Sequence, residues 1–129
     1  MKYETVIGIE IHCELKTKTK MFSGAPTSFG EVANTCVNEV DLGHPGTLPC
    51  VNKDAVRLAI LAATALKCEI DPLVKFDRKN YYYSDLPKGF QITQQFHPIG
   101  SHGVITIKTD TGTKDIRINR IHMEEDTAK

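Results

Sequence analysis

The stretch Val104-Ile-Thr-Ile-Lys-Thr-Asp-Thr-Gly-Thr-Lys-Asp-Ile-Arg-Ile118 decides the fold. Two runs in which apolar and polar residues alternate flank a short turn, residues 110–112, that contains a glycine. Such alternation on both sides of a turn is typical of a β-hairpin. We expect the first strand over residues 104–109 and the second over residues 114–124. The sequence therefore predicts an antiparallel hairpin near the C-terminal end of the chain.

The second strand of this hairpin changes phase along its length. Ile116 and Ile118 have one parity, whereas Ile121 and Met123 have the other. Because successive residues of a strand point to opposite faces, this pattern needs either a bulge or a change in which face is buried. Bulges often lie beside active sites, and the change falls just before His122.

A helix is predicted over residues 53–67. Asn52 is a suitable N-cap, and Asp54 suits the positive end of the helix dipole. Apolar residues then recur at helical spacing, namely Val56, Ala59, Ile60, Ala63 and Leu66. The alanines on this face favour close packing against a sheet. One helix with mainly antiparallel strands predicts an α+β domain.

The N-terminal residues 3–16 alternate in polarity and are predicted to form another strand. Glu10, His12 and Glu14 then share one face, and the aliphatic residues and Cys13 lie on the face toward the core. From alternation alone, a polar face in contact with water is the simpler interpretation.

The rest of the chain contains a long loop and three short strands. Residues 23–49 are rich in Gly, Pro, Ser and Asn and are predicted to lack regular structure. A loop of this length in a compact domain is usually functional or held in place by other groups. Short strands are expected at residues 73–76, 81–83 and 90–96.

Composition limits the class of protein. The chain has 129 residues, enough for one domain, and its formal net charge is zero, so any contact with RNA must use local patches. The N-terminus lacks the apolar run of a signal peptide, and the longest apolar stretch, residues 58–66, is too short to span a membrane. The four cysteines form no Cys-x-x-Cys pair, and we expect reduced, mostly buried thiols. We therefore expect a cytoplasmic protein without membrane contact.

Two groups of residues could carry chemistry. The first combines Glu10 and His12 with the run from His122 to Asp126. Glu10, His12, Glu124 and Glu125 could converge on one divalent cation if their strands lie close together. The alternative is a solvated acidic strand end. The second group is the segment 75–91, in which lysines could neutralise phosphate and three tyrosines could stack on a base. The alternative there is a surface strand whose tyrosines cover the edge of the core.

Several familiar nucleotide and nucleophile motifs are absent from the sequence. It contains no Walker A loop, no Gly-x-Gly-x-x-Gly turn and no Gly-x-Ser-x-Gly elbow. A nucleotide that binds to this chain must therefore use a different cradle.

Several segments together resemble the B subunit of the bacterial and organellar aspartyl/glutamyl-tRNA amidotransferases. The matching pieces are ETVIGIEIH, the FG turn, LGHPGTLP with VNKDAV, KFDRKNYYYSDLPKGFQITQ and RIHMEED. The resemblance implies a cradle-shaped α+β catalytic domain, of which residues 1–129 form the N-terminal part. The family's helical and tRNA-binding tail domains are then absent from this chain.

The resemblance also implies an ATP-dependent carbon–nitrogen ligase that uses glutamine as amido donor. ATP and Mg²⁺ activate the side-chain carboxylate of misacylated Glu-tRNA(Gln) or Asp-tRNA(Asn), and ammonia from a glutaminase (amidase) subunit displaces the phosphate. A small third subunit joins them in a heterotrimer. We expect residues 1–129 alone to be inactive, and the sequence does not tell which tRNA is the natural substrate.

The resemblance assigns roles to eight residues by position. The expected metal ligands are Glu10, His12, Glu124 and Glu125. The expected catalytic residues are Lys79, Asp85, Lys88 and Asp126. The first three belong to the nucleotide and ammonia-channel side, the two lysines are expected to bind the nucleotide, and Asp126 could serve either this set or the metal ligands. These roles rest on the resemblance and not on spacing.

The sequence departs from the family in two places. Many members bind zinc through two cysteine pairs, but the corresponding positions here are Ser23, Ala25, Asn38 and Asp41. We therefore predict that no zinc is bound and that packing or a partner subunit holds the loop. In addition, Ser84 replaces a proline that is usual in the family.

Two other functions remain open at this point. The His and carboxylate cluster also suits a metal-dependent phosphohydrolase or nuclease, which needs only metal and substrate. A non-catalytic tRNA-binding or assembly module would tolerate loss of the carboxylates.

Overall fold

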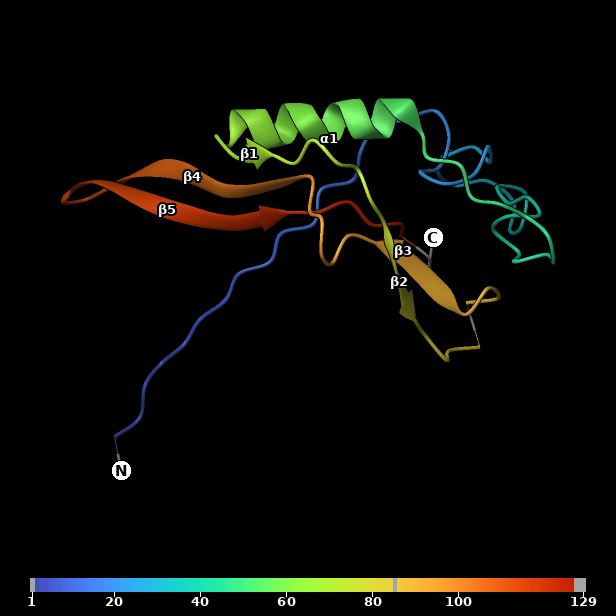
Figure 1. Ribbon diagram of the computed structural model, residues 1–129, viewed down its shortest axis with the longest axis horizontal. Helices are drawn as coiled ribbons and strands as arrows, with labels where there is room; N and C mark the ends of the chain where they lie inside the picture. The colour runs from blue at the N-terminus through green and yellow to red at the C-terminus, as the bar shows by residue number, and fades with distance from the viewer. Residues whose placement is uncertain (1, 85, 127–129) are drawn as a thin grey trace.

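The computed structural model describes residues 2–84 and 86–126. It contains the helix α1 (Lys53–Ala65) and the strands β1 (Glu69–Ile70), β2 (Asp77–Asn80), β3 (Phe90–Thr93), β4 (Gly100–Thr109) and β5 (Gly112–Ile121). One sheet has the order β1-β4-β5 and the other pairs β2 with β3, and all pairings are antiparallel. Figure 1 shows α1 running along the first sheet, while the β2–β3 ribbon extends away from the helix. The predicted α+β class is confirmed.

The predicted hairpin is formed by β4 and β5, but it contains no bulge. Its register is constant from Thr109 opposite Gly112 to Gly100 opposite Ile121. The phase change in the sequence instead marks the end of the strand, because β5 stops at Ile121 and the buried Met123 lies beyond it. Met123 is therefore buried because the chain beyond β5 enters the core beside Ala55, Ala59 and Ile99.

The predicted helix is confirmed, and its first turn is capped as expected. The side-chain oxygen of Asn52 accepts hydrogen bonds from the backbone N–H groups of Asp54 and Ala55, at 2.9 and 3.4 Å. Its amide also donates to the Thr19 hydroxyl at 2.9 Å. The Asn52 side chain thus gives hydrogen-bond acceptors to free backbone N–H groups at the start of the helix. It also connects the helix to Thr19 in the preceding part of the chain.

The buried stripe of α1 consists of Ala55, Ala59 and Ala63, so the predicted stripe is confirmed at Ala59 and Ala63, while Ala55 was missed and Ile60 is exposed. Close packing on a sheet is confirmed where α1 meets β4. A Cβ atom added at Gly100 would lie 2.9 Å from the Cβ of Ala63, closer than such atoms approach in proteins. Only a glycine facing an alanine allows this separation.

A small core joins the two sheets and the helix. Ala55, Ala59, Ile99 and Met123 are buried together. Beside them, the buried amide of Gln94 accepts from the Met123 backbone N–H at 3.0 Å and donates to the Lys75 carbonyl at 3.2 Å. This side chain fixes the segment that follows β5 against β3, where a buried polar group needs such partners.

The predicted N-terminal strand, residues 3–16, is wrong for this structure. These residues are extended but form no strand, and the alternating isoleucines 7, 9 and 11 are exposed. Cys13 is exposed too, although it was predicted to face the core. Figure 1 shows the segment leading away from the sheets. Alternation supplies a face for burial, but a strand also needs a neighbour for its backbone hydrogen bonds.

The shorter strands lie close to their predicted positions, with shifts. The predicted strand 73–76 is displaced to β2, residues 81–83 form no strand, and β3 covers only the first part of 90–96. Residues 23–49 form the predicted loop, which contains one isolated bridge, Thr19 to Pro26, at its start. The four cysteines are free, as predicted, but the prediction that they are mostly buried is wrong, because two are exposed and two are only partly buried. Among the described residues, no helix is long and apolar enough to cross a membrane.

Asp41 holds the long loop together. Its carboxylate accepts hydrogen bonds from the Ser23 hydroxyl at 3.0 and 3.1 Å and from the Asn38 backbone N–H at 3.0 Å, and Lys20 lies 3.6 Å away. The Asn38 side chain in turn accepts from the backbone N–H of Val40 at 3.0 Å. We call Lys20, Ser23, Asn38 and Asp41 the loop clamp.

The loop clamp predicts a clear loss of stability in Asp41→Ala. The variant removes a half-buried charged acceptor from two hydrogen bonds and an ion pair, so we expect the free energy of unfolding to fall by about 2 kcal/mol. Urea denaturation measures this change. The control is Asp54→Ala, whose carboxylate pairs with Arg57 on the exposed side of α1 and is expected to cost less than about 1 kcal/mol. Equal effects of the two variants would contradict the clamp.

Candidate functional site

The most strongly held charged pair in the structure joins Lys88 to Glu125. Their side chains are 6% and 13% exposed, and the ammonium nitrogen lies 2.5 Å from one carboxylate oxygen. The other carboxylate oxygen accepts from the backbone N–H of Ile92 at 2.7 Å. Both oxygens of Glu125 are therefore engaged by groups of the chain itself. Removing either member of such a pair leaves a buried charge without compensation.

Glu125 is also held through its backbone. Its N–H donates to the Ile92 carbonyl at 3.1 Å, and its carbonyl accepts from the Gln91 side chain at 2.7 Å. The segment after β5 thus lies along β3 like a short extra strand. This arrangement places the neighbouring Glu124 at a defined position, since an extended chain sends the two side chains to opposite sides.

Glu124 faces two histidines. One carboxylate oxygen lies 3.8 Å from Nδ1 of His12, and the other lies 3.5 Å from Nε2 of His122. The Thr93 hydroxyl is 3.5 Å from the second oxygen. These separations are longer than good hydrogen bonds, so the carboxylate keeps its capacity to accept. The predicted proximity of His12 to Glu124 is therefore present, although residues 3–16 form no strand.

Lys79 brings positive charge to the same region. Its ammonium nitrogen lies 5.1 Å from the centroid of the Tyr81 ring, a cation–π distance. The interaction with Tyr81 is the main cause that raises the pKa of Lys79, and the charges of Glu124 and Glu10 add to the effect. The side chain is therefore a stable cation whose charge interacts with those of two carboxylates predicted from the sequence, Glu124 and Glu10.

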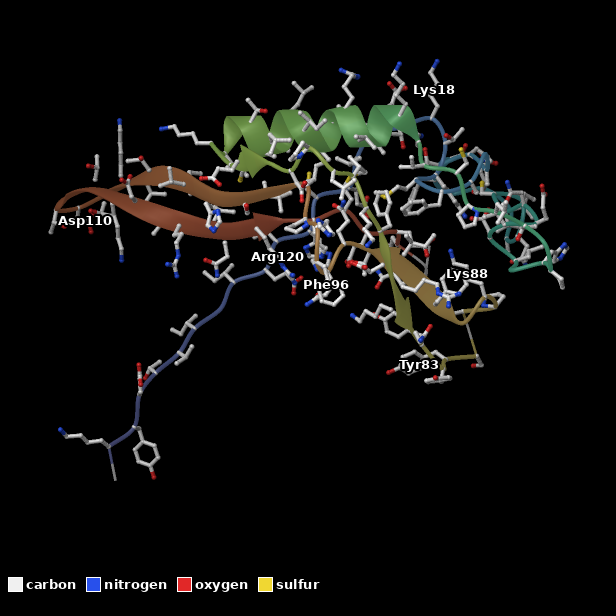
Figure 2. All side chains as sticks on the ribbon, viewed as in Figure 1. Lys18, Tyr83, Lys88, Phe96, Asp110 and Arg120 are labelled. Carbon is white, nitrogen blue, oxygen red and sulfur yellow. The ribbon has the colours of Figure 1, made fainter. Side chains whose placement is uncertain are left out.

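The predicted site residues fall into two groups around β3. His12 and Glu124 lie together and Lys88 pairs with Glu125, while Lys79 is joined to Glu124 and Glu10 only through the influence of their charges. Figure 2 shows Lys88 near the end of the β2–β3 ribbon. Asp85 lies outside the described residues, and Asp126 is exposed at their C-terminal limit. Among the described residues, no group of three or more His, Cys, Asp and Glu side chains is placed to hold a metal ion. The four-residue metal shell stays a prediction.

His122 was placed in the candidate cluster from the sequence but not among the expected ligands, and Gln91 was given no role. His122 contacts Glu124, with Nε2 at 3.5 Å from a carboxylate oxygen, so it belongs with the histidine and carboxylate group. Gln91 holds the Glu125 backbone, but no local pattern links two residues 34 positions apart.

The loop clamp bears on the zinc prediction. Three of the four positions at which the family resemblance implied zinc-binding cysteines, Ser23, Asn38 and Asp41, belong to the clamp. The fourth, Ala25, is buried and donates its N–H to the Ser23 hydroxyl at 3.3 Å. Because side chains hold the loop, we expect a chelator to leave the urea midpoint unchanged and elemental analysis to find no stoichiometric zinc. One zinc per chain would contradict this prediction.

Comparison with known proteins settles the family. A model of the GatB/GatE catalytic domain matches residues 5–129. The chain belongs to the GatB/GatE catalytic-domain family. It is 61% identical to the aspartyl/glutamyl-tRNA(Asn/Gln) amidotransferase B subunit of Mesoplasma florum over 127 residues, and 62% identical to that of Mycoplasma mobile over 127 residues. Against the B subunit of Bacillus licheniformis it is 56% identical over all 129 residues.

This GatB/GatE domain corresponds to only part of those relatives. The matches cover 98% or 100% of the chain but 26% or 27% of each relative. The chain therefore spans about a quarter of the length of the curated relatives it matches. The family assignment confirms the resemblance that the sequence motifs indicated.

Proposed function

We propose that this chain forms the N-terminal part of the catalytic domain in the B subunit of a tRNA-dependent amidotransferase. In this proposal, ATP phosphorylates the side-chain carboxylate of Glu-tRNA(Gln) or Asp-tRNA(Asn), which yields an acyl phosphate and ADP. Ammonia from a glutaminase subunit then displaces the phosphate to give the amide. The observation that carries the proposal is the family match over residues 5–129.

The geometry around Glu124 supports a role in phosphoryl transfer. Mg²⁺ prefers oxygen ligands and often uses only one or two carboxylates. Glu124, with His12 at 3.8 Å, is a suitable donor, and we propose that Glu10 joins it when the ion binds. Bound ATP and Mg²⁺ would supply the phosphoryl group and the charge neutralisation that this reaction needs. Lys79, whose charge interacts with those of Glu124 and Glu10, is a cation that would attract the phosphate oxygens.

Glu125 suits a different role from the one that its position in the family implies. Lys88 and the Ile92 N–H already occupy its two oxygens, so the side chain fits an ion pair better than a metal ligand in this arrangement. We propose that the pair fixes the segment that presents Glu124. Lys88 and Glu125 would then not bind the cation themselves but would fix the position of Glu124, which does.

The proposed assembly and location follow the family as well. The glutaminase (amidase) subunit supplies ammonia, a small third subunit makes up the heterotrimer, and the enzyme works in the cytoplasm on misacylated tRNA.

A reconstituted assay tests the proposed function. The assembled enzyme is expected to form amidated tRNA only when ATP, Mg²⁺, glutamine and misacylated tRNA are all present, and to cleave little ATP without the tRNA. Rapid phosphate release without tRNA would instead favour a metal-dependent hydrolase. Unchanged activity after loss of Glu124 would favour a non-catalytic binding module.

A further inference from the structure

The long loop reaches the Lys88–Glu125 pair through one glycine. A Cβ atom added at Gly43 would lie 2.7 Å from the Cβ of Lys88 and 2.8 Å from its Cα. Cβ atoms in proteins do not approach other atoms so closely, so the loop backbone rests directly against the base of the lysine side chain. Figure 2 shows Lys88 at the end of the β2–β3 ribbon, on the side of this loop. The loop therefore contacts the residue that holds Glu125.

Gly43 ends a single helical turn whose two ends are closed by hydrogen bonds. At its start, the side-chain oxygen of Asn38 accepts from two backbone N–H groups at 3.0 and 3.3 Å. At its end, the His44 N–H donates to the Glu39 carbonyl at 3.0 Å, and the Gly43 N–H donates to the Val40 carbonyl at 3.1 Å. These two bonds form a Schellman motif, which needs a residue with positive φ, and Gly43 has a φ of 69°. We call residues 38–44 the loop turn.

Asp41 anchors the loop turn to the segment that precedes it. Within the loop clamp, this carboxylate accepts from the Ser23 hydroxyl at 3.0 and 3.1 Å and lies 3.6 Å from the Lys20 ammonium. Asp41 comes only two residues before Gly43 and belongs to the same turn, so the contacts that fix one also fix the other. A shift of the loop turn away from Lys88 would therefore stretch the loop clamp.

Lys88 has little room to move when the loop turn presses on it. It lies in the connection between β2 and β3, which is closed by a 3.0 Å hydrogen bond from the N–H of Gly89. Its side chain is buried, and the ammonium lies 5.2 Å from the centroid of the Phe90 ring and pairs with Glu125. Because closely packed groups transmit strain, a displacement of the lysine backbone reaches Glu125 and the segment that carries Glu124.

We propose that the loop turn positions the cation site and that Gly43 is the residue through which it acts. The loop turn supports Lys88 at its backbone, while Glu125 holds the same side chain at its ammonium end. Gly43 is therefore a positioning residue, which affects Glu124 through Lys88 and Glu125. The inference rests on the proposed function, which gives Glu124 its role in the reaction. A displacement of about 1 Å in such a site can lower the rate about a hundredfold.

Gly43→Asn, made in the full-length subunit of the assembled enzyme, tests the inference. Asparagine tolerates positive φ but adds a Cβ against Lys88. We expect amide formation to slow about tenfold or more, and the Mg²⁺ concentration for half the maximal rate to rise about threefold or more.

Gly46→Asn is the matched control on the same loop. Gly46 has a φ of 86°, and a Cβ added there would meet no atom of the described residues within 4 Å. This variant makes the same backbone change without the contact, so it should keep the wild-type rate and the wild-type dependence on Mg²⁺. A general loss of loop stability would affect both variants alike, whereas a positioning role affects only Gly43→Asn.

A second measurement does not depend on activity. Urea unfolding of Lys88→Met, Glu125→Gln and the double variant gives the coupling free energy between the two side chains. In the Gly43→Asn background this coupling is expected to fall by about half or more, and in the Gly46→Asn background it should stay unchanged. Should Gly43→Asn fail to fold, Asp41→Asn weakens the loop clamp without adding an atom near Lys88 and is expected to lower both the rate and the coupling.

The two measurements distinguish failure of the inference from failure of the proposed function. An unchanged rate overturns the inference, and so does an unchanged coupling, because the effect would then not pass through Lys88. The proposed function stands in both cases. If the wild type forms no amide, the proposed function fails, and the coupling alone decides whether the loop turn supports Lys88.

Discussion

Glu125→Gln is expected to destabilise the protein by about 3 kcal/mol and to abolish amide formation in the assembled enzyme. The variant keeps the shape of the side chain but leaves the buried ammonium of Lys88 without its counter-charge. The segment that presents Glu124 then loses an anchor. Urea denaturation measures the change in stability, and a transamidation assay with misacylated tRNA measures activity. Glutaminase activity of the partner subunit is expected to survive at least in part.

The double variant Lys88→Met/Glu125→Gln is the control for this prediction. Because it removes both charges, it should be more stable than the single variant, since no unpaired charge remains in the interior. We expect it to stay inactive if the pair serves the reaction as well as the fold. Undiminished transamidation by Glu125→Gln would contradict the proposal that this residue is needed to position Glu124.

Glu124→Gln is expected to lower transamidation about a thousandfold, the equivalent of roughly 4 kcal/mol of transition-state stabilisation. The carboxylate lies between His12 and His122 at distances that leave it able to bind a cation. The side chain is 27% exposed, so stability should change by less than about 1 kcal/mol. Activity and urea unfolding measured on the same preparation separate this variant from Glu125→Gln.

Glu31→Gln is the matched control for Glu124→Gln, because Glu31 is an exposed carboxylate on the long loop outside the site. It should retain full activity. If Glu124→Gln keeps more than about half of the wild-type rate, a cation site at Glu124 is excluded.

The parts of the fold that the sequence predicted well depend on local signals. The β4–β5 hairpin follows from alternation around a glycine turn, and α1 follows from its Asn52 cap and helical spacing. Residues 3–16 show the limit of such signals. Their alternation is as regular as that of β4, but among the described residues no strand lies beside them. A local pattern predicts which face of a strand can be buried, but it does not show whether a second strand is available to pair with it.

The site was less predictable because its contacts join distant parts of the chain. The pairing of Lys88 with Glu125 spans 37 residues, and that of Ser23 with Asp41 spans 18. Family resemblance identified the charged residues, but it did not indicate which of them bind each other. Only His122 carried a local signal, through its spacing from Glu124.

The loop clamp has a consequence for how the protein matures. A loop organised by a bound metal is complete only after the ion arrives, whereas every copy of this chain carries Lys20, Ser23, Asn38 and Asp41 from the moment of its synthesis. On the prediction that no zinc binds, the folding of this region is expected to be independent of the cell's supply of zinc. The loop is also expected to be less stable than one that binds a metal, because hydrogen bonds and one ion pair contribute less free energy to folding than a metal site does.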